Sequence, residues 1–334
     1  MRKSTLAAAL VAVALAAVGC SSATATPTPP PDAQAVMAAA SKASYPSRVE
    51  ITVGGSYTTG AATISLPDNM VTVDLDTSAG KGSVHLAVPA SLLGGALAGL
   101  GVTGDTLTVD LLYDGAALYA KSPALPALVS QLSVLAPGSS MPPLAADTWA
   151  KLIDEATMKQ LMASAGSAVG SAVPSLPAAP SAAADMQTTL DQIGATLTLG
   201  PQTTGPGGPA NDVKVTVDPA KLQAFLAAHP QQLPTGQIPG LSSLPSLDQL
   251  SSLSADVLVD AATSRVEQVT LTAGMTQNGS TSSASIKVGI GEAPSSVTFA
   301  TPSGAVDLPL MQILGPVVSN MLGGSGLPIP SANP

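Results

Sequence analysis

The chain of 334 residues is poor in the groups from which catalytic and metal sites are built. It has one cysteine, Cys20, and two histidines, His85 and His229. A single cysteine excludes an internal disulfide and a thiolate metal site. The sequence also lacks a Gly-x-Ser-x-Gly nucleophile elbow, a His-Glu-x-x-His helix and a phosphate-binding loop. We therefore predict that the protein is not an enzyme and uses no cofactor or metal.

Aromatic and charged residues are also few. The chain contains one Trp, four Tyr and two Phe, and charged residues make up 10% of it against 45% apolar residues. A core must therefore be built from aliphatic side chains. The formal net charge is −9. An acidic balance argues against binding of nucleic acid and against electrostatic docking on anionic lipid.

The N-terminus has the layout of an export signal. Arg2 and Lys3 precede an apolar run from Leu6 to Val18, which is too short to span a bilayer. Ala17-Val18-Gly19-Cys20 then resembles the bacterial lipobox, with Ala where Leu is commonest. We predict cleavage before Cys20 and an acyl anchor, diacylglyceryl and palmitate, on that cysteine. The alternative is an ordinary signal peptide cut nearby, which would leave Cys20 free.

The predicted organisation is a signal peptide (1–19), a lipidated cysteine with a flexible Pro- and Thr-rich tether (20–32), one domain (33–322) and a disordered tail (323–334). Cleavage removes Arg2 and Lys3 and leaves ten basic against twenty-one acidic residues, a net charge of −11. Membrane contact would then come from the anchor, at the extracytoplasmic face of the cell membrane. We expect a monomer.

Period-two alternation predicts most of the domain to be strands. The first half shows it at Val49–Val53, Val71–Asp76, Val84–Val88 and Leu107–Leu111, with a tight turn at Asp114-Gly115 leading into a strand at 118–120. The second half shows it at 196–199, 213–217, 257–259, 266–271, 284–288 and 297–299. Closely spaced strands of this kind predict an antiparallel meander with one dry and one wet face. His85 lies on the wet phase, and the Asp74/Asp76 and Asp110/Asp114 pairs fit an acidic solvated surface better than glycosidase carboxylates.

Helices are expected at 32–44, 125–135 and 218–228, where His229 would meet the last carbonyls, and at two further places. Asp147 or Thr148 would cap a helix that carries Trp149, Leu152, Ile153 and Ala156 on one face, and residues 307–322 would form an apolar helix broken at Pro316. The segments at 166–184 and 231–252 are read as connections. The fold class is therefore α+β, a curved antiparallel sheet with helices on its concave face.

The order of these parts resembles actinobacterial envelope lipoproteins of the LppX and LprG type, which share a half-barrel with the carriers LolA and LolB. The resemblance is one of pattern over roughly residues 33–322. It rests on the following stretches: Leu111-Leu112-Tyr113-Asp114-Gly115-Ala116-Ala117-Leu118-Tyr119-Ala120, followed at a distance by Trp149; Asp212-Val213-Lys214-Val215-Thr216-Val217-Asp218; and Ala255-Asp256-Val257-Leu258-Val259-Asp260 with Arg265-Val266-Glu267-Gln268-Val269.

The resemblance implies an apolar cavity that takes acyl chains. The chain is thus predicted to be a non-enzymatic binder or carrier of lipid or another apolar ligand. The alternative is a protein-interaction or sensory lipoprotein with a filled core, similar to RseB-like regulators. Methionines suit a pocket that adapts to flexible chains, although the same residues would serve plain core packing. The candidate lining consists of Trp149, Ile153, Met158, Met162, Met311, Leu314 and Val318.

Overall fold

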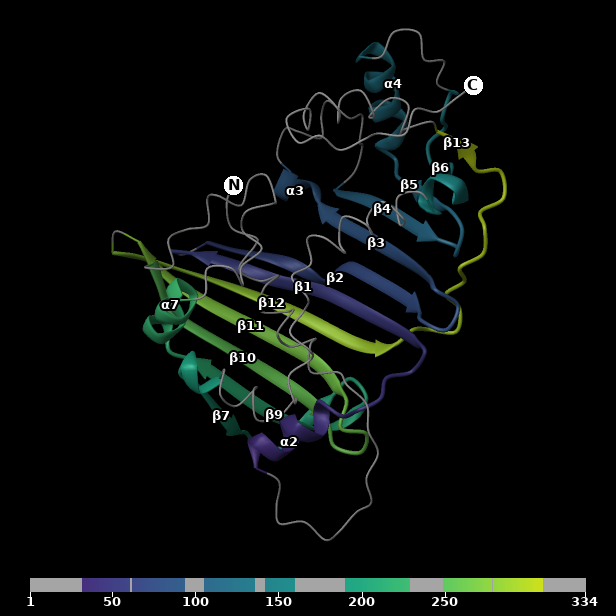
Figure 1. The fold of residues 1–334 in the computed structure, drawn as a ribbon. Coiled ribbons are helices and arrows are strands. Elements are labelled where there is room, and N and C mark those ends of the chain that lie inside the picture. The colour runs from purple at the N-terminus through teal and green to yellow at the C-terminus, as the bar shows by residue number, and fades with distance from the viewer. Residues whose placement is uncertain are drawn as a thin grey trace. The chain divides into compact units, whose positions relative to one another are not determined.

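The computed structural model describes residues 32–60, 62–93, 105–135, 142–159, 190–228, 249–277 and 279–308. Within them the chain is largely β (Figure 1). Hydrogen bonds link the strands in the open order β13-β6-β5-β4-β3-β2-β1-β12-β11-β10-β9-β7, with β8 attached to β9. The predicted antiparallel, strand-rich architecture is confirmed. The one parallel pair recorded in these ranges is β13 with β6.

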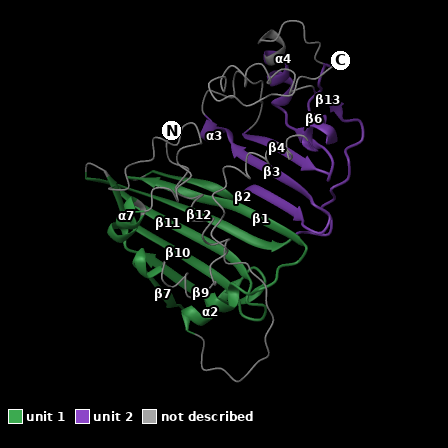
Figure 2. Cartoon of the chain, viewed as in Figure 1, with its two compact units in different colours: residues 1–69, 175–292 green, residues 70–174, 293–334 purple. Residues whose placement is uncertain are grey.

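The chain divides into two compact units, which Figure 2 colours separately. Unit 1 comprises residues 1–69 and 175–292, and unit 2 comprises residues 70–174 and 293–334. The boundary falls inside one strand, β2 (Ala62–Asp76), so both units share that strand covalently. The predicted strands at 49–53, 71–76, 196–199, 213–217 and 266–271 all lie within observed ones.

Unit 1 is an antiparallel sheet in which long hairpins follow one another. Its register places Val53 opposite Val288, and Val288 opposite Val269. Valines therefore share one face across three neighbouring strands, as the alternation predicts. The strands are β1 (Arg48–Thr59), β7 (Ala195–Leu199), β8 (Thr203–Gly205), β9 (Gly208–Val217), β10 (Leu250–Asp260), β11 (Val266–Gln277) and β12 (Ser280–Glu292).

Helix α2 (Ala33–Ala40) begins at Asp32, whose Oδ1 accepts the Ala35 N–H at 2.7 Å. This cap satisfies a donor that the first helical turn leaves without a partner. Val36 then packs on Val213 and Val257 in a cluster whose sheet members are almost completely buried. The helix thus closes one end of the apolar face of unit 1.

Helix α7 (Pro219–Ala228) starts with Asp218 as its cap and proline at its first position, as predicted. Its Leu222 packs against Leu253 and Leu271. Leu253 lies four residues from Val257 on β10, so the two positions point to the same side. Both helices therefore cover one face of the unit 1 sheet, at opposite ends of the strands.

Unit 2 continues from β2 through β3 (Lys81–Pro89), β4 (Thr106–Tyr113), β5 (Leu118–Lys121), β6 (Ala150–Ile153) and β13 (Val306–Asp307). A short helix, α3 (Ala90–Leu93), follows β3, and α4 (Leu125–Leu135) follows β5. Val129 of α4 packs on Ala150, which is 0% exposed, and on Leu308. This helix covers the apolar face at its β6 end.

Three sequence predictions are wrong in this region. Residues 150–153 form β6 instead of a helix, and the helical turn begins only after Asp154, whose Oδ1 accepts the Thr157 N–H. Trp149 and Ile153 at helical spacing also suit a strand, and pairing with β5 decides between the two. Residues 297–299 are not a strand, and 306–307 form β13 instead of the start of a helix. The rest of the predicted closing helix, and the 166–184 connection, lie outside the described residues.

Two adjacent glycines fix how closely β1 approaches its neighbours in unit 1. A Cβ at Gly54 would overlap the Pro67 carbonyl on β2, and one at Gly55 would overlap the Ser285 carbonyl on β12. Gly55 also has a φ of 153°, which side chains disfavour. Neither position has room for a side chain.

Candidate apolar binding surface

The candidate site is the apolar face of β2, β3 and β4 in unit 2. The register stacks aliphatic side chains in rows across these strands: Val71, Leu86 and Val109 form one row, and Val73, Val84 and Leu111 form the next. Such rows arise because side chains at every second position share a face. We call this face the aliphatic surface. Its members are Val71, Val73, Leu75, Val84, Leu86, Val88, Leu107, Val109 and Leu111.

The aliphatic surface differs from the helix-covered face of unit 1 in its exposure. Every one of its nine members is half-buried and none is fully buried. In unit 1, Val213 beneath α2 is 0% exposed and Val259 is 1% exposed. Full burial of a Val or Leu side chain contributes about 1.5–3 kcal/mol, so each half-buried side chain leaves only part of that contribution unrealised. Some apolar area therefore stays accessible on this surface.

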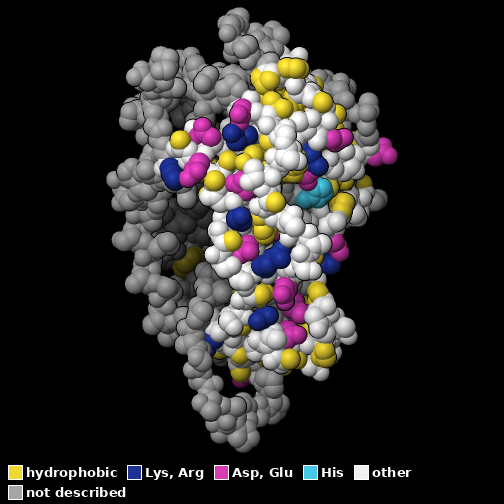
Figure 3. Space-filling model, turned by 90° about the vertical axis from the view of Figure 1, so that its right-hand side faces the viewer, with side chains coloured by type: hydrophobic (Ala, Val, Ile, Leu, Met, Phe, Trp, Pro, Cys, Tyr) yellow, Lys and Arg dark blue, Asp and Glu magenta, His cyan; other side chains and the backbone are white. Residues whose placement is uncertain are grey.

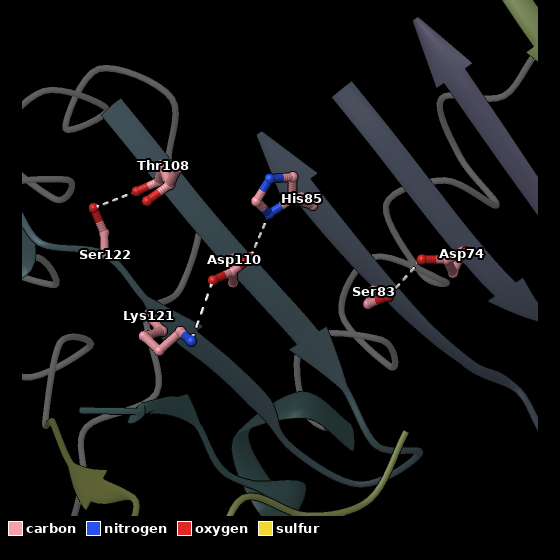
Figure 4. A network of polar contacts seen from close by, with 7 residues as sticks. All are labelled: Asp74, Ser83, His85, Thr108, Asp110, Lys121 and Ser122. Atoms are coloured by element: carbon pink, nitrogen blue, oxygen red, sulfur yellow. Dashed lines mark hydrogen bonds and ion pairs between the residues drawn. The ribbon is translucent and has the colours of Figure 1, made fainter. Parts of the chain in front are cut away.

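The opposite face of the same strands is polar (Figure 4). His85 on β3 lies with its Nδ1 2.6 Å from Oδ1 of Asp110 on β4, and Lys121 on β5 lies 3.6 Å from the other oxygen. The Lys121 ammonium also sits 5.3 Å from the centre of the Trp149 ring, within cation–π range. On the side shown in Figure 3, charges of both signs are interspersed with uncharged groups. His85, Asp110 and Lys121 thus lie on the wet face that the alternation predicts, whereas Asp74 is buried and the interpretation of it as a solvated surface carboxylate is wrong.

The His85–Asp110 pair lacks the further groups of a catalytic triad in the ranges described. A base that activates a nucleophile needs a hydroxyl or thiol within hydrogen-bond reach. The hydrogen bond recorded for the His85 ring goes to Asp110, and the Ser83 hydroxyl instead donates to Asp74 at 3.3 Å. Asp74 is 7% exposed, and its other oxygen has no partner in the described part of the chain. His229 falls outside it.

Asp114, in the β4–β5 turn, joins this turn to the segment 293–308. Its Oδ1 accepts the N–H groups of Ala116 and Ala117, and its Oδ2 accepts the hydroxyls of Tyr119 at 3.2 Å and Thr301 at 2.6 Å. Burial raises the pKa of Asp114, but these four donors outweigh it and lower the pKa from 3.8 to about 2. We call these contacts the Asp114 latch.

The latch is backed by an apolar contact and by strand pairing. Phe299 packs with Leu112 and Tyr119, and Trp149 lies against the same cluster. Burial, followed by the adjacent Asp114 charge, raises the pKa of the Tyr119 phenol. Beyond Phe299 the chain pairs with β6, where the Val306 N–H donates to the Trp149 carbonyl at 2.9 Å. The segment is thus held at the turn and at the β6 edge.

The predicted lining residues are placed as follows. Trp149 lies on the polar side of unit 2, next to Lys121, and Ile153 is half-buried opposite Leu118. Met158 is half-buried in the helical turn at 155–159. Met162, Met311, Leu314, Val318 and Cys20 lie outside the described residues. Sequence reasoning did not single out the aliphatic surface as a site, although the alternation at 71–75, 84–88 and 107–111 carried its signal.

Comparison with known proteins adds little. No protein-family model and no curated protein matches the chain. A solved structure described as the crystal structure of ywiB protein from Bacillus subtilis matches 73% of this chain and 92% of its own, at 5% identity and a TM-score of 0.15. A score that low carries no argument about fold or function.

Two properties of the described ranges complete the account of the site. No helix among them is both long and apolar enough to cross a membrane. The same ranges hold no group of three or more His, Cys, Asp or Glu side chains placed to bind a metal ion.

Proposed function

We propose that the protein is a cell-envelope lipoprotein, anchored through Cys20, that binds or carries a lipid or another apolar ligand on the aliphatic surface. The observation that carries the proposal is that all nine aliphatic side chains there are half-buried, whereas Val213 and Val259 beneath α2 are 0% and 1% exposed. Binding an apolar ligand would remove that surface from water at about 25 cal/mol per Å². No reactive group is needed for this function.

The proposal includes a curved half-barrel whose concave face carries the helices, as in the LppX and LprG type. The packing of α2 and α7 on one face of unit 1 supports this arrangement. So does α4, which packs through Val129 on the same face of unit 2 as the aliphatic surface, because Ala150 pairs with Ala120 and Ala120 with Leu111. The anchor on Cys20 would hold the chain at the extracytoplasmic side of the membrane.

The test compares neighbouring positions on opposite faces of β3. Leu86 belongs to the aliphatic surface, whereas Ala87 faces the polar side and pairs with Thr108. A soluble form of the chain that starts at Ser21, and so lacks the anchor cysteine, is titrated with a fluorescent fatty acyl probe. We expect Leu86→Gln to weaken probe binding about tenfold, a loss of about 1.4 kcal/mol, and Ala87→Gln to leave it unchanged.

Native mass spectrometry of the same preparation provides an independent readout, because a carrier retains acyl lipid through purification. Absence of both probe binding and co-purified lipid would contradict the proposal. That result would favour the alternative, a protein-interaction lipoprotein with a filled core.

A further inference from the structure

The path of residues 293–308 determines on which face of unit 2 the described chain ends. β13 pairs parallel with β6, and the Leu308 N–H then donates to the Lys151 carbonyl at 3.0 Å. The Leu308 side chain is 3% exposed and packs on Ala150 and Val129. Ala150 shares its face with the aliphatic surface through Ala120. The chain therefore leaves the described region on the apolar side of the sheet.

The sequence that follows suits an apolar surface. Residues 309–334 contain no charged side chain. Within residues 309–322, written PLMQILGPVVSNML, eight positions are Leu, Met, Ile or Val. A charged segment would pay a desolvation penalty against aliphatic side chains, whereas this one would gain by burying its own. The aliphatic surface and this segment are thus chemically matched.

The segment is also long enough. β3 lies four places from β13 in the strand order, which corresponds to about 19 Å at a strand spacing of about 4.8 Å. Fourteen residues span about 21 Å even when fully helical, and more when extended. Residues 309–322 therefore reach Leu86 and Val84 from Leu308 without any change in the residues described.

We propose that residues 309–322 dock on the aliphatic surface and act as an intramolecular occupant that competes with the apolar ligand. The docking depends on the geometry at Leu308, and the competition rests on the function proposed above. The segment lowers the apparent affinity for ligand by the fraction of time it occupies the surface. Release of the segment would be a step in loading.

Crosslinking tests the docking without reference to any ligand. The soluble form that starts at Ser21 has no cysteine, so the introduced thiols are the only ones present. Met321→Cys, whose position lies about 20 Å along the chain from Leu308 even in a fully helical segment, is combined with Leu86→Cys on the aliphatic surface, or with Ala87→Cys on the opposite face as the matched control. We expect a short bismaleimide to link the first pair and not the second, as read by peptide mass spectrometry. Equal linkage in both pairs, or in neither, would overturn the docking.

The acyl probe tests the competition. A chain that ends at Leu308 should bind the probe more tightly than the parent, about tenfold if the segment occupies the surface nine-tenths of the time. Linking Leu86→Cys to Met321→Cys should abolish binding. The unlinked double variant, which keeps the full chain, is the control for loss of fold.

The failures of the two proposals are distinguishable. Probe binding without the specific crosslink would refute the docked segment and leave the carrier function standing. A specific crosslink, with no probe bound by either the parent or the shortened chain, would refute the competition together with the carrier function. In that case residues 309–322 would be a permanent part of the core.

Discussion

Replacing Asp114 by Asn should weaken the latch between the β4–β5 turn and the segment 293–308. In the parent, Oδ1 accepts the N–H groups of Ala116 and Ala117, and Oδ2 accepts the hydroxyls of Tyr119 and Thr301. Asn keeps the shape of the side chain and one acceptor oxygen, but its NH2 group replaces the other oxygen and cannot accept a hydrogen bond from the donors there. Neutral substitution therefore removes the charge that shortens and strengthens all four bonds.

The pKa gives the size of the effect. A fall from 3.8 to about 2 corresponds to about 2.4 kcal/mol at about 1.4 kcal/mol per pKa unit. Asp114 is half-buried, so solvent screening reduces the contribution, and we expect Asp114→Asn to cost about 1–2 kcal/mol at pH 7. Thr301→Val removes the 2.6 Å bond alone and should cost about 1 kcal/mol. In the double variant the two losses should not add, because they share one bond.

The pH dependence has a definite sign. The pKa of Asp114 is lower in the folded chain than in the unfolded chain, so its contribution is complete above about pH 4 and is lost as pH falls through about 2. Denaturant unfolding at pH 7, 4 and 2.5 measures this. The parent should lose more stability than Asp114→Asn across that range. Asp68→Asn is the control, because the Asp68 side chain is 73% exposed in its ion pair with Lys287 and such pairs contribute little. Equal stability of Asp114→Asn and the parent at pH 7, with equal slopes below pH 4, would refute the reasoning.

Two other predictions concern packing and the anchor. Ala150→Leu should lower the free energy of unfolding by about 1–3 kcal/mol, because Ala150 is 0% exposed between Val129 and Leu308. The control Ala87→Leu, on the polar face, should change it by less than about 0.5 kcal/mol. Similar thermal melts for the two variants would contradict the packing described for Ala150. Cys20→Ala should abolish incorporation of labelled palmitate and release the chain from the membrane fraction, because one thiol would carry the whole attachment, and continued labelling would show that the lipobox was misread.

The strands were predictable from the sequence because a half-buried strand alternates apolar and polar residues. Val71–Leu75 and Leu107–Leu111 show this alternation over enough positions to exclude a helix. The four residues of β6 were not predicted as a strand, because so short a segment fits both the helical and the strand period. Its state is decided by pairing with Leu118 and Tyr119, more than thirty positions earlier. Short elements are governed by such distant partners.

The candidate site was predictable only in part. Alternation shows which side of β3 is apolar, but it does not show how completely that side is covered, and the proposed function depends on coverage. The latch illustrates the same limit. Asp114-Gly115 was correctly read as a turn, yet Thr301, which completes it, lies 187 residues away. The sequence around Asp114 does not predict a contact with Thr301, and the sequence around Thr301 does not predict a contact with Asp114.

The glycine pair of β1 bears on the fidelity of folding. Strands as rich in Ser, Thr and Val as β1 and β12 hold few charges that would penalise a shifted alignment, and such strands are prone to slippage. Gly54 and Gly55 remove that freedom, because each faces a neighbouring carbonyl with no space for a side chain. A shift by two residues, which keeps the apolar face inward, would bring Val53 or Tyr57 against the carbonyl of Ser285. Steric overlap would therefore exclude such misaligned pairings of β1, so that two positions without side chains select the correct register.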